Sequence, residues 1–170
     1  MTNLKELPDY LDYNLKVIFI GFNPGIRSAE TGHHYAGRGN RFWKLLYESG
    51  LTPYQLEPEE DYKLLDLGYG LTNIVMRPSK KASDLDKGEY LAGRKILKAK
   101  LQKYNPEYAC YTGIGVYRNF SGKKKIKRGL QDDQVLPGIK DFVISSPSGL
   151  NRTPYQEQLS RYKELKQLIT

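Results

Sequence analysis

The 170-residue sequence has a single cysteine and only two histidines. One cysteine excludes an intrachain disulfide, a cysteine-ligated iron–sulfur cluster and a thiolate set for zinc. Cys110 lies in the apolar run YACYTG, which favours a buried, inert thiol over a nucleophile. The two histidines, His33 and His34, are neighbours, and adjacent residues rarely ligate one ion together. We therefore expect no metal and no cofactor.

Long hydrophobic runs are also missing. No apolar stretch approaches the roughly 18 residues of a membrane-spanning helix, and the first residues, MTNLKELPDYLDY, are too polar for a secretory signal. We expect a protein without a membrane partner that is cytoplasmic and nucleoid-associated, or nuclear in an organism with a nucleus. With 39% apolar residues, the chain is long enough to bury one hydrophobic core. Residues 1–170 are therefore expected to form one domain, and the protein to act as a monomer.

Acidic residues are outnumbered by basic ones, which gives a net charge of +8 and a pI near 9.4. Clustered Lys and Arg gain free energy by displacing counterions from phosphates, so the excess predicts a polyanionic partner. Fourteen tyrosines add candidates for base stacking, although most are expected to be core or half-buried rings. The strongest charge run, GKKKIKRG (122–129), fits a solvated loop and a phosphate contact equally well.

β-prone and helix-prone segments alternate along the chain. Apolar, β-prone runs predict strands within 15–21, 69–79, 107–115 and 141–152. Amphipathic patterns with start and stop signals predict helices over 40–50, 58–68, 88–106 and 153–169. In the last of these helices, Thr153 is the expected N-cap, with Pro154 at the first position. The alternation predicts a three-layer α/β/α fold with a central, mostly parallel, four-stranded sheet.

In such a sheet, ligands bind beyond the carboxyl ends of the strands, where loops 21–40, 113–118 and 145–152 are expected to converge. The first of these loops begins the sequence GFNPGIRSAETGHHYAGRGNRFW (21–43), which contains a single carboxylate. A hydrolase loop usually contains a general base. Here the candidate is an amide, Asn23, whereas Asn40 is typical of a helix N-cap.

Four motifs occur in order near predicted strand ends, namely GFNPG, GHHYAGRGNRFWK, LTNIV and SPSGLNR. A lone Asn-Pro-Gly is only a turn. Together, from about residue 14 to the terminal helix, the motifs resemble the mismatch-specific uracil/thymine-DNA glycosylases, a branch of the uracil-DNA glycosylase superfamily. The resemblance implies a uracil-DNA-glycosylase-like fold and a monofunctional DNA glycosylase of base excision repair. Its implied substrate is uracil mispaired with guanine in double-stranded DNA, with thymine and etheno-cytosine as further candidates.

The resemblance makes Asn23 the catalytic residue. In the family that the chain resembles, cleavage passes through an oxocarbenium-like sugar with the pyrimidine anion as leaving group, so water placement and anion stabilisation would matter more than proton abstraction. A carboxamide can hold a water by accepting its hydrogen bond but cannot take its proton, which predicts slow turnover. No lysine lies in the motif to form a Schiff base, so base release without strand cleavage is expected.

The resemblance also implies a pocket for a nucleotide rotated out of the duplex. Tyr35 would stack on the extruded base, the backbone N–H of Phe22 would receive charge developing on the pyrimidine, and Asn73 would bind the base edge. Phe22 replaces the Ile of most relatives, which predicts a narrower pocket that disfavours thymine. Ser28 would lie near the C5 face of the base. His34 could contact a phosphate or the sugar of the extruded nucleotide, but the default interpretation is a surface loop histidine without a role in binding.

The motif SPSGLNR is the implied intercalating loop. Leu150 would fill the gap left by the extruded nucleotide, although incidental exposure is the alternative explanation. Gly149 and Asn151 would offer backbone groups to the widowed guanine. Ser148 and Arg152 would contact the DNA backbone, and Arg152 could instead enter the gap.

Two other functions fit parts of the sequence. A non-catalytic binder of structured or damaged nucleic acid would explain the charge and the rings, but would leave the Asn23 loop without a role. A small-molecule phosphate-binding α/β protein would use the glycines of residues 21–39 as an anion nest. That loop lacks the glycine spacing and the lysine of a nucleoside-triphosphate site. The glycosylase hypothesis is therefore favoured.

Overall fold

The computed structural model describes residues 4–170, and its centre is a five-stranded sheet of order β2-β1-β3-β5-β4. The strands are β1 (Val17–Gly21), β2 (Tyr69–Asn73), β3 (Tyr108–Thr112), β4 (Gly129–Leu130) and β5 (Lys140–Ile144). All neighbouring pairs are parallel except β4 and β5. The predicted α/β class with a mostly parallel sheet is confirmed. The predicted number of strands was four, and the added strand β4 has only two residues, too few to show a strand periodicity.

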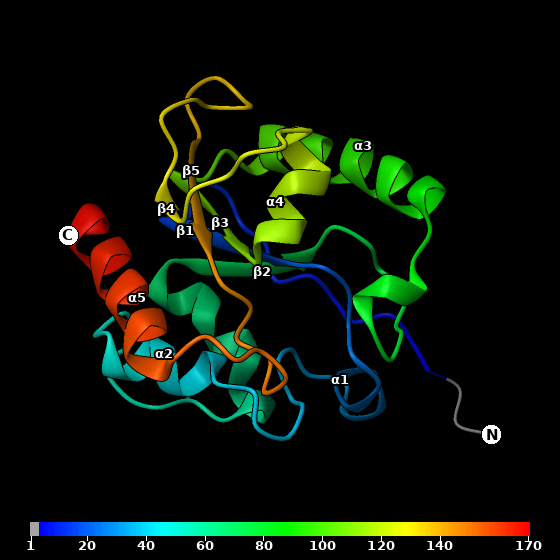
Figure 1. Ribbon diagram of the computed structural model, residues 1–170. Helices are drawn as coiled ribbons and strands as arrows, with labels where there is room; N and C mark the ends of the chain where they lie inside the picture. Colours follow the sequence, from blue (N-terminus) through cyan, green and yellow to red (C-terminus); the bar gives the residue numbers. More distant parts are fainter. Residues whose placement is uncertain (1–3) are drawn as a thin grey trace.

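Helices cover both faces of the sheet, as the three layers in Figure 1 show. The α-helices are α1 (Ile26–Thr31), α2 (Phe42–Glu48), α3 (Lys87–Tyr104), α4 (Ile114–Ser121) and α5 (Tyr155–Ile169). Two 3-10 helices are η1 (Pro58–Leu67) and η2 (Ala82–Asp84). In the described part of the chain, none of these helices has the length and apolar composition needed to cross a membrane.

Strand β1 is buried on both faces, as a central parallel strand should be. Val17 and Phe19 join the core formed with α2, η1 and α5, whereas Ile18 and Ile20 join the core formed with α3 and α4. The apolar run read in the sequence is therefore shared between two layers. Cys110 on β3 is fully buried in the first of these cores, and burial raises the pKa of its thiol. The expected burial of Cys110 is confirmed.

Beyond shifts at the ends of elements, three local features differ from the sequence-based predictions. The N-cap of α5 is Pro154 rather than Thr153, whose hydroxyl donates to Asn151 Oδ1 at 3.1 Å instead. Residues 114–118, expected in a loop, form the first turns of α4. The expected loop 21–40 contains the six-residue helix α1, which has no acidic residue in its first turn and no side-chain cap to indicate it.

Candidate active site

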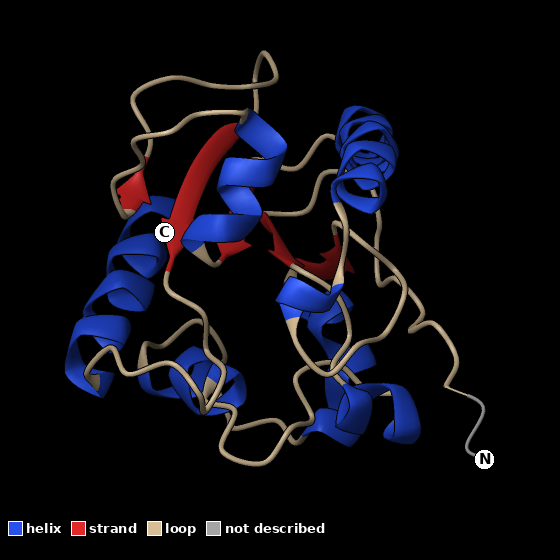
Figure 2. Cartoon of the chain, turned by 45° about the vertical axis from the view of Figure 1, so that its right-hand side comes forward, coloured by secondary structure: helices blue, strands red, loops and turns tan. Residues whose placement is uncertain are grey.

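A cleft of about 440 Å³ opens at the carboxyl edge of the parallel strands. The segments that follow β1 and β5 meet there, below the sheet in Figure 1 and, from a second side, in Figure 2. The carboxyl ends of parallel strands share one edge, so segments distant in sequence come together. The predicted site residues that line the cleft are Phe22, Asn23, Ser28, His34, Tyr35, Asn73, Ser148 and Leu150.

The Asn23 side chain is held in one orientation by two hydrogen bonds. Its Nδ2 donates to the Arg77 carbonyl at 2.8 Å and to Ser79 Oγ at 2.7 Å. Both amide hydrogens are therefore used, and Oδ1 is left as the acceptor that this residue offers to the cleft. Such an acceptor can hold a water molecule, but a neutral amide cannot deprotonate it.

Asn73 ends β2 directly beside Gly21, its register partner on β1. A Cβ at Gly21 would lie 2.6 Å from Asn73 Oδ1, so only glycine lets the carboxamide lie across the end of β1. The side chain is 7% exposed and lines the cleft. Within residues 4–170 its carboxamide makes no hydrogen bond, and the side chain reaches the cleft instead of being enclosed in the core. Its donors and acceptor are therefore available to a ligand.

Tyr35 forms part of the cleft wall with a fixed ring. One face stacks on Phe42, with ring centroids 3.9 Å apart and planes at 23°. Thr112 Oγ1 donates to the Ile20 carbonyl at 3.1 Å, so the Tyr35 hydroxyl donates to Thr112 Oγ1 at 3.0 Å. Burial raises the pKa of the phenol, which stays neutral. The backbone of Tyr35 has φ 52°, a left-handed conformation that these contacts hold in place. Since Phe42 covers one face of the ring, only the other face can receive a ligand.

His34 is a structural residue of the same loop. It is 2% exposed, so the default interpretation as a surface loop histidine is wrong. Burial lowers the pKa of His34, and the neutral ring donates from Nε2 to the Pro8 carbonyl at 2.8 Å. Its backbone N–H donates to Asp61 Oδ2 at 2.9 Å, and the other oxygen of Asp61 lies 3.2 Å from His33 Nδ1. Asp61, fully buried on η1, thus fixes the loop that carries Tyr35.

Ser28 and Phe22 also shape the cleft by packing. Ser28 is 5% exposed, and its Oγ accepts the Ala36 N–H at 3.0 Å, which ties α1 to the Tyr35 loop. The Phe22 ring packs against the start of α4, where a Cβ at Gly115 would lie 2.6 Å from the ring and one at Gly113 3.2 Å. These two glycines make room for the larger side chain on that side. The effect of Phe22 on pocket width remains a prediction.

The predicted intercalating loop presents Leu150 at the mouth of the cleft, 84% exposed. The loop is anchored from within, because Asn151 Nδ2 donates to the Ser146 carbonyl at 2.7 Å and the Leu150 N–H donates to Ser148 Oγ at 3.2 Å. Gly149 approaches the segment before α2 so closely that a Cβ would lie 3.0 Å from the Gly39 carbonyl oxygen. Backbone groups of Asn151 were expected to face a guanine, but its N–H donates to the Ser148 carbonyl at 3.0 Å. That donor is therefore already used.

The segment that precedes α2, which contains Asn40 and Arg41, is hydrogen-bonded to the Leu150 loop. Asn40 Oδ1 accepts the N–H of Phe42, the first residue of α2, at 3.0 Å. This agrees with a capping role, one residue before the N-cap position held by Arg41. The Arg41 N–H donates to the Pro147 carbonyl at 2.8 Å. The two loops therefore form one continuous wall of the cleft.

Comparisons with known proteins identify the family of this chain. The family model described as the uracil DNA glycosylase superfamily matches residues 8–169. The chain belongs to the uracil DNA glycosylase superfamily. The fold is similar to a solution NMR structure from Methanosarcina acetivorans of a candidate uracil DNA glycosylase, with a TM-score of 0.60 and 20% identity. That alignment covers 96% of this chain and 98% of the other. Family membership makes the chain a hydrolase of N-glycosyl bonds whose partner is DNA.

Sequence reasoning missed part of this glycosylase cleft. The segment after β2 contributes Ser79, Lys80, Lys81 and Ala82 to the lining, whereas residues 113–118 contribute none. Asp61 does not line the cleft but fixes the loop that carries Tyr35. The Ser79 side chain both accepts from Asn23 and donates to the Lys81 carbonyl at 2.7 Å. A signal was available, because this segment follows β2, whose carboxyl end lies beside that of β1. The predicted loop 145–152 follows β5 in the same way, at the same edge of the sheet.

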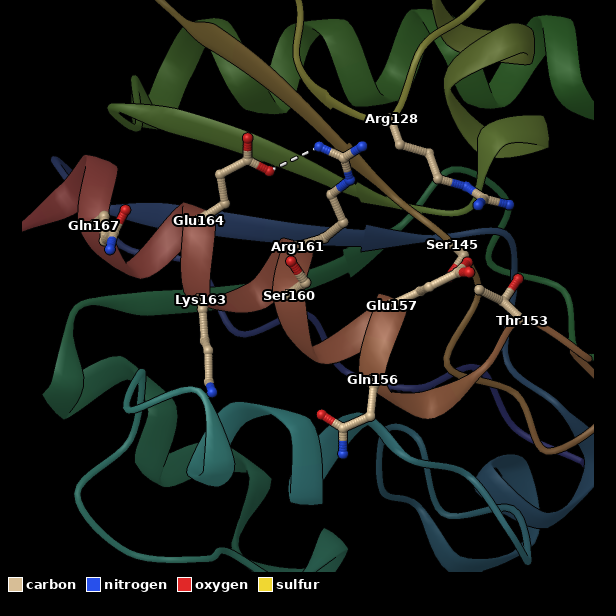
Figure 3. Close-up of a pocket in the computed structure, with 10 residues that line it drawn as sticks. All are labelled: Arg128, Ser145, Thr153, Gln156, Glu157, Ser160, Arg161, Lys163, Glu164 and Gln167. Carbon is tan, nitrogen blue, oxygen red and sulfur yellow. Dashed lines mark hydrogen bonds and ion pairs between the residues drawn. The ribbon is translucent and has the colours of Figure 1, made fainter.

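A second hollow of the glycosylase, about 690 Å³, runs along α5 and reaches the Leu150 loop at Ser145 and Thr153 (Figure 3). Its charges are mixed, and Arg161 is paired with Glu164 at 2.9 Å. Arg128, the last basic residue of the run 122–129, extends toward Ser145 and Thr153 in Figure 3. Its buried Nε has no hydrogen-bond partner within residues 4–170. Arg128 is therefore a basic side chain beside the Leu150 loop with an unpartnered, buried Nε.

The basic run 122–129 as a whole lies outside the lining of the active-site cleft. Lys127 is paired with Asp132 at 2.9 Å and Lys123 lies 3.9 Å from Asp133. The choice between a solvated loop and a phosphate contact stays open for these lysines.

Proposed function

We propose that this superfamily member is a monofunctional DNA glycosylase that hydrolyses the N-glycosidic bond of uracil mispaired with guanine in double-stranded DNA. The observation that carries the proposal is the orientation of Asn23. Its Nδ2 is committed to Arg77 and Ser79, so the carboxamide offers Oδ1 to a water molecule at the cleft. The protein would act as one glycosylase domain and as a monomer, in base excision repair.

The chemistry follows from what the cleft contains. As the bond between the base and C1′ breaks, the electron pair leaves with the pyrimidine and the sugar becomes an oxocarbenium-like cation. A water held by Asn23 Oδ1 adds to C1′ and then loses its proton to solvent. Because the amide does not remove that proton, the enzyme depends on the tendency of the bond to break and turns over slowly.

Asn73 and Tyr35 support recognition of the extruded base. The Asn73 carboxamide has both a donor and an acceptor, which match a carbonyl and the imide N–H of uracil. The face of Tyr35 not covered by Phe42 can stack on the pyrimidine ring, a contact that is typically worth about 1–3 kcal/mol per base. Phe22 is proposed to restrict the pocket, so thymine and etheno-cytosine are expected to react more slowly than uracil.

The exposed Leu150 is proposed to fill the gap left in the duplex, and Arg152, Ser148 and Arg128 to contact phosphates around it. The anchored loop supports this, because a wedge must keep its position while it separates stacked bases. The net charge of +8 predicts that DNA binding weakens steeply as salt is raised. A flat salt profile would show that the positive charge is not used on phosphate.

The test is an excision assay on an end-labelled duplex with one G·U pair, treated with alkali after incubation. We expect strand breaks only after alkali with the wild type, and a loss of at least about 100-fold for Asn23→Ala. Asn119→Ala is the matched control, since Asn119 also donates through Nδ2 to a carbonyl, that of Gly115 at 2.9 Å, but on α4. Binding without excision would indicate a non-catalytic nucleic-acid binder. The absence of both binding and excision would indicate the phosphate-binding alternative.

A further inference from the structure

The two atoms that hold the Asn23 carboxamide belong to one short segment, residues 77–79, after β2. The Ser79 hydroxyl donates to the Lys81 carbonyl at 2.7 Å, so its oxygen is an acceptor toward Asn23 at 2.7 Å. The second acceptor is the backbone carbonyl of Arg77. The direction in which Asn23 Oδ1 points therefore depends on how firmly the Arg77 backbone is held.

The backbone alone holds this segment only at its ends. The Val75 N–H donates to the Phe22 carbonyl at 2.9 Å, and the Ser79 N–H donates to the Pro24 carbonyl at 3.1 Å. Between them, the N–H groups of Met76 and Arg77 make no hydrogen bond to any described residue. Another contact must fix the Arg77 carbonyl.

The Arg77 side chain supplies that contact. Its guanidinium Nε donates to Glu89 Oε1 at 2.5 Å. Its Nη2 donates to Glu89 Oε2 at 3.0 Å and to the Asp84 carbonyl at 3.1 Å. A planar guanidinium bound by both oxygens of one carboxylate has a defined orientation as well as a defined position. The hydrogen bonds from Arg77 lower the pKa of Glu89 to about 2, so the pair stays ionised in neutral and mildly acidic solution.

Glu89 is itself fixed to a rigid element. It is the third residue of α3, where its Oε2 accepts the Asp86 N–H at 2.9 Å and its own N–H donates to Asp86 Oδ1 at 2.8 Å. Helix α3 packs closely on the segment after β2, since a Cβ at Gly93 would lie 2.0 Å from the Ile74 carbonyl oxygen. The chain of contacts therefore runs from α3 through Glu89 and Arg77 to Asn23.

We propose that the Arg77–Glu89 pair is a positioning clamp that orients the Asn23 carboxamide for water placement, which rests on the glycosylase function proposed above. Neither residue lines the cleft, and the side chains of Arg77 and Glu89 are 50% and 25% exposed. Exposed ion pairs contribute little to folding stability, so variants of the pair are expected to fold. The effect should appear in the rate of the chemical step and not in DNA affinity.

The chain offers a matched control for Glu89→Gln. Glu60 is also the third residue of its helix, accepts the Glu57 N–H at 3.1 Å and pairs with Lys63 at 2.7 Å. Glu60→Gln therefore removes the same charge from the same kind of cap on η1. For Glu89→Gln we expect a single-turnover excision rate about tenfold lower, with an unchanged dissociation constant for the G·U duplex. For Glu60→Gln we expect no change in either.

Two further variants test whether the residues act as a unit. Arg77→Lys keeps the charge but cannot bind both oxygens, so its rate should fall between wild type and Arg77→Ala. Arg77→Ala combined with Glu89→Gln should lose no more than the larger single loss, because both changes remove the same clamp. Additive losses would overturn the clamp.

A readout independent of activity separates this inference from the proposed function. The side-chain amide resonances of Asn23 in an ¹H–¹⁵N spectrum should shift or broaden in Glu89→Gln and stay unchanged in Glu60→Gln. Wild-type excision with unchanged rates and resonances in Glu89→Gln would overturn the clamp while leaving the function intact. Shifted Asn23 resonances in a protein that never excises uracil would support the clamp and overturn the function.

Discussion

Replacing Leu150 by alanine should impair excision from a paired lesion without destabilising the protein. The side chain is 84% exposed, and the anchors of its loop are backbone groups and polar side chains that the substitution leaves unchanged. The free energy of unfolding should therefore change by less than about 0.5 kcal/mol. In the complex, a buried carbon group contributes about 0.8 kcal/mol, so the groups that distinguish leucine from alanine contribute about 2 kcal/mol. This corresponds to a loss of about thirtyfold.

The assay compares single-turnover excision of uracil from a G·U pair and from a bubble of unpaired bases. A wedge offsets the unstacking of a paired base, so Leu150→Ala should lose about thirtyfold on the pair and much less on the bubble. Leu91→Ala is the control, because Leu91 is 63% exposed on α3 and does not line the cleft. Equal losses on the two substrates, or a lowered melting temperature, would refute the reasoning.

Gly21→Ala should lower excision about tenfold, because the new Cβ would lie 2.6 Å from Asn73 Oδ1 and displace the base-binding amide; wild-type kinetics would contradict this contact. In Asn23→Asp, one carboxylate oxygen would take the place of Nδ2, which in the wild type lies 2.8 Å from the Arg77 carbonyl oxygen. Two oxygens facing each other disfavour the ionised form, so the pKa of the new carboxyl should be raised. Only its ionised form can take a proton from water, so excision should rise with pH through that pKa, and a pH-independent rate would refute the geometry. Burial lowers the pKa of His34, so the unfolded state binds a proton more readily than the folded state. The melting temperature should be constant above about pH 6.5 and fall below it, with a weaker dependence in His34→Gln.

Two of the residues predicted for the site share a property that sequence patterns can detect. Asn23 and Asn73 lie just after or at the end of a buried strand, and strand ends are marked by apolar runs that stop at glycine or polar residues. Tyr35 lies farther along the chain, between α1 and α2, and was indicated by its motif alone. Their motifs were therefore readable, and the structure brings all three to one cleft. The roles assigned to individual side chains beyond this juxtaposition remain predictions.

The residues that sequence reasoning missed act through contacts between distant segments. Asp61 binds the backbone of His34 from 27 positions away, and Ser79 binds Asn23 across 56 positions. His34 appeared exposed because it stands among glycines and polar residues, yet η1 covers it. Asn151 appeared free because nothing in a turn sequence shows which of its groups the turn itself uses.

The sequence by itself determined the alternation of strands and helices, the parallel sheet and the order of the motifs, because these depend on local periodicity and on short-range turn chemistry. Only the tertiary structure decided which way the Asn23 amide faces, that the Asn73 amide has no partner within residues 4–170, and that Leu150 stands out from an anchored loop. Each of these depends on the distance between atoms of different segments, and such distances exist only once the chain has packed.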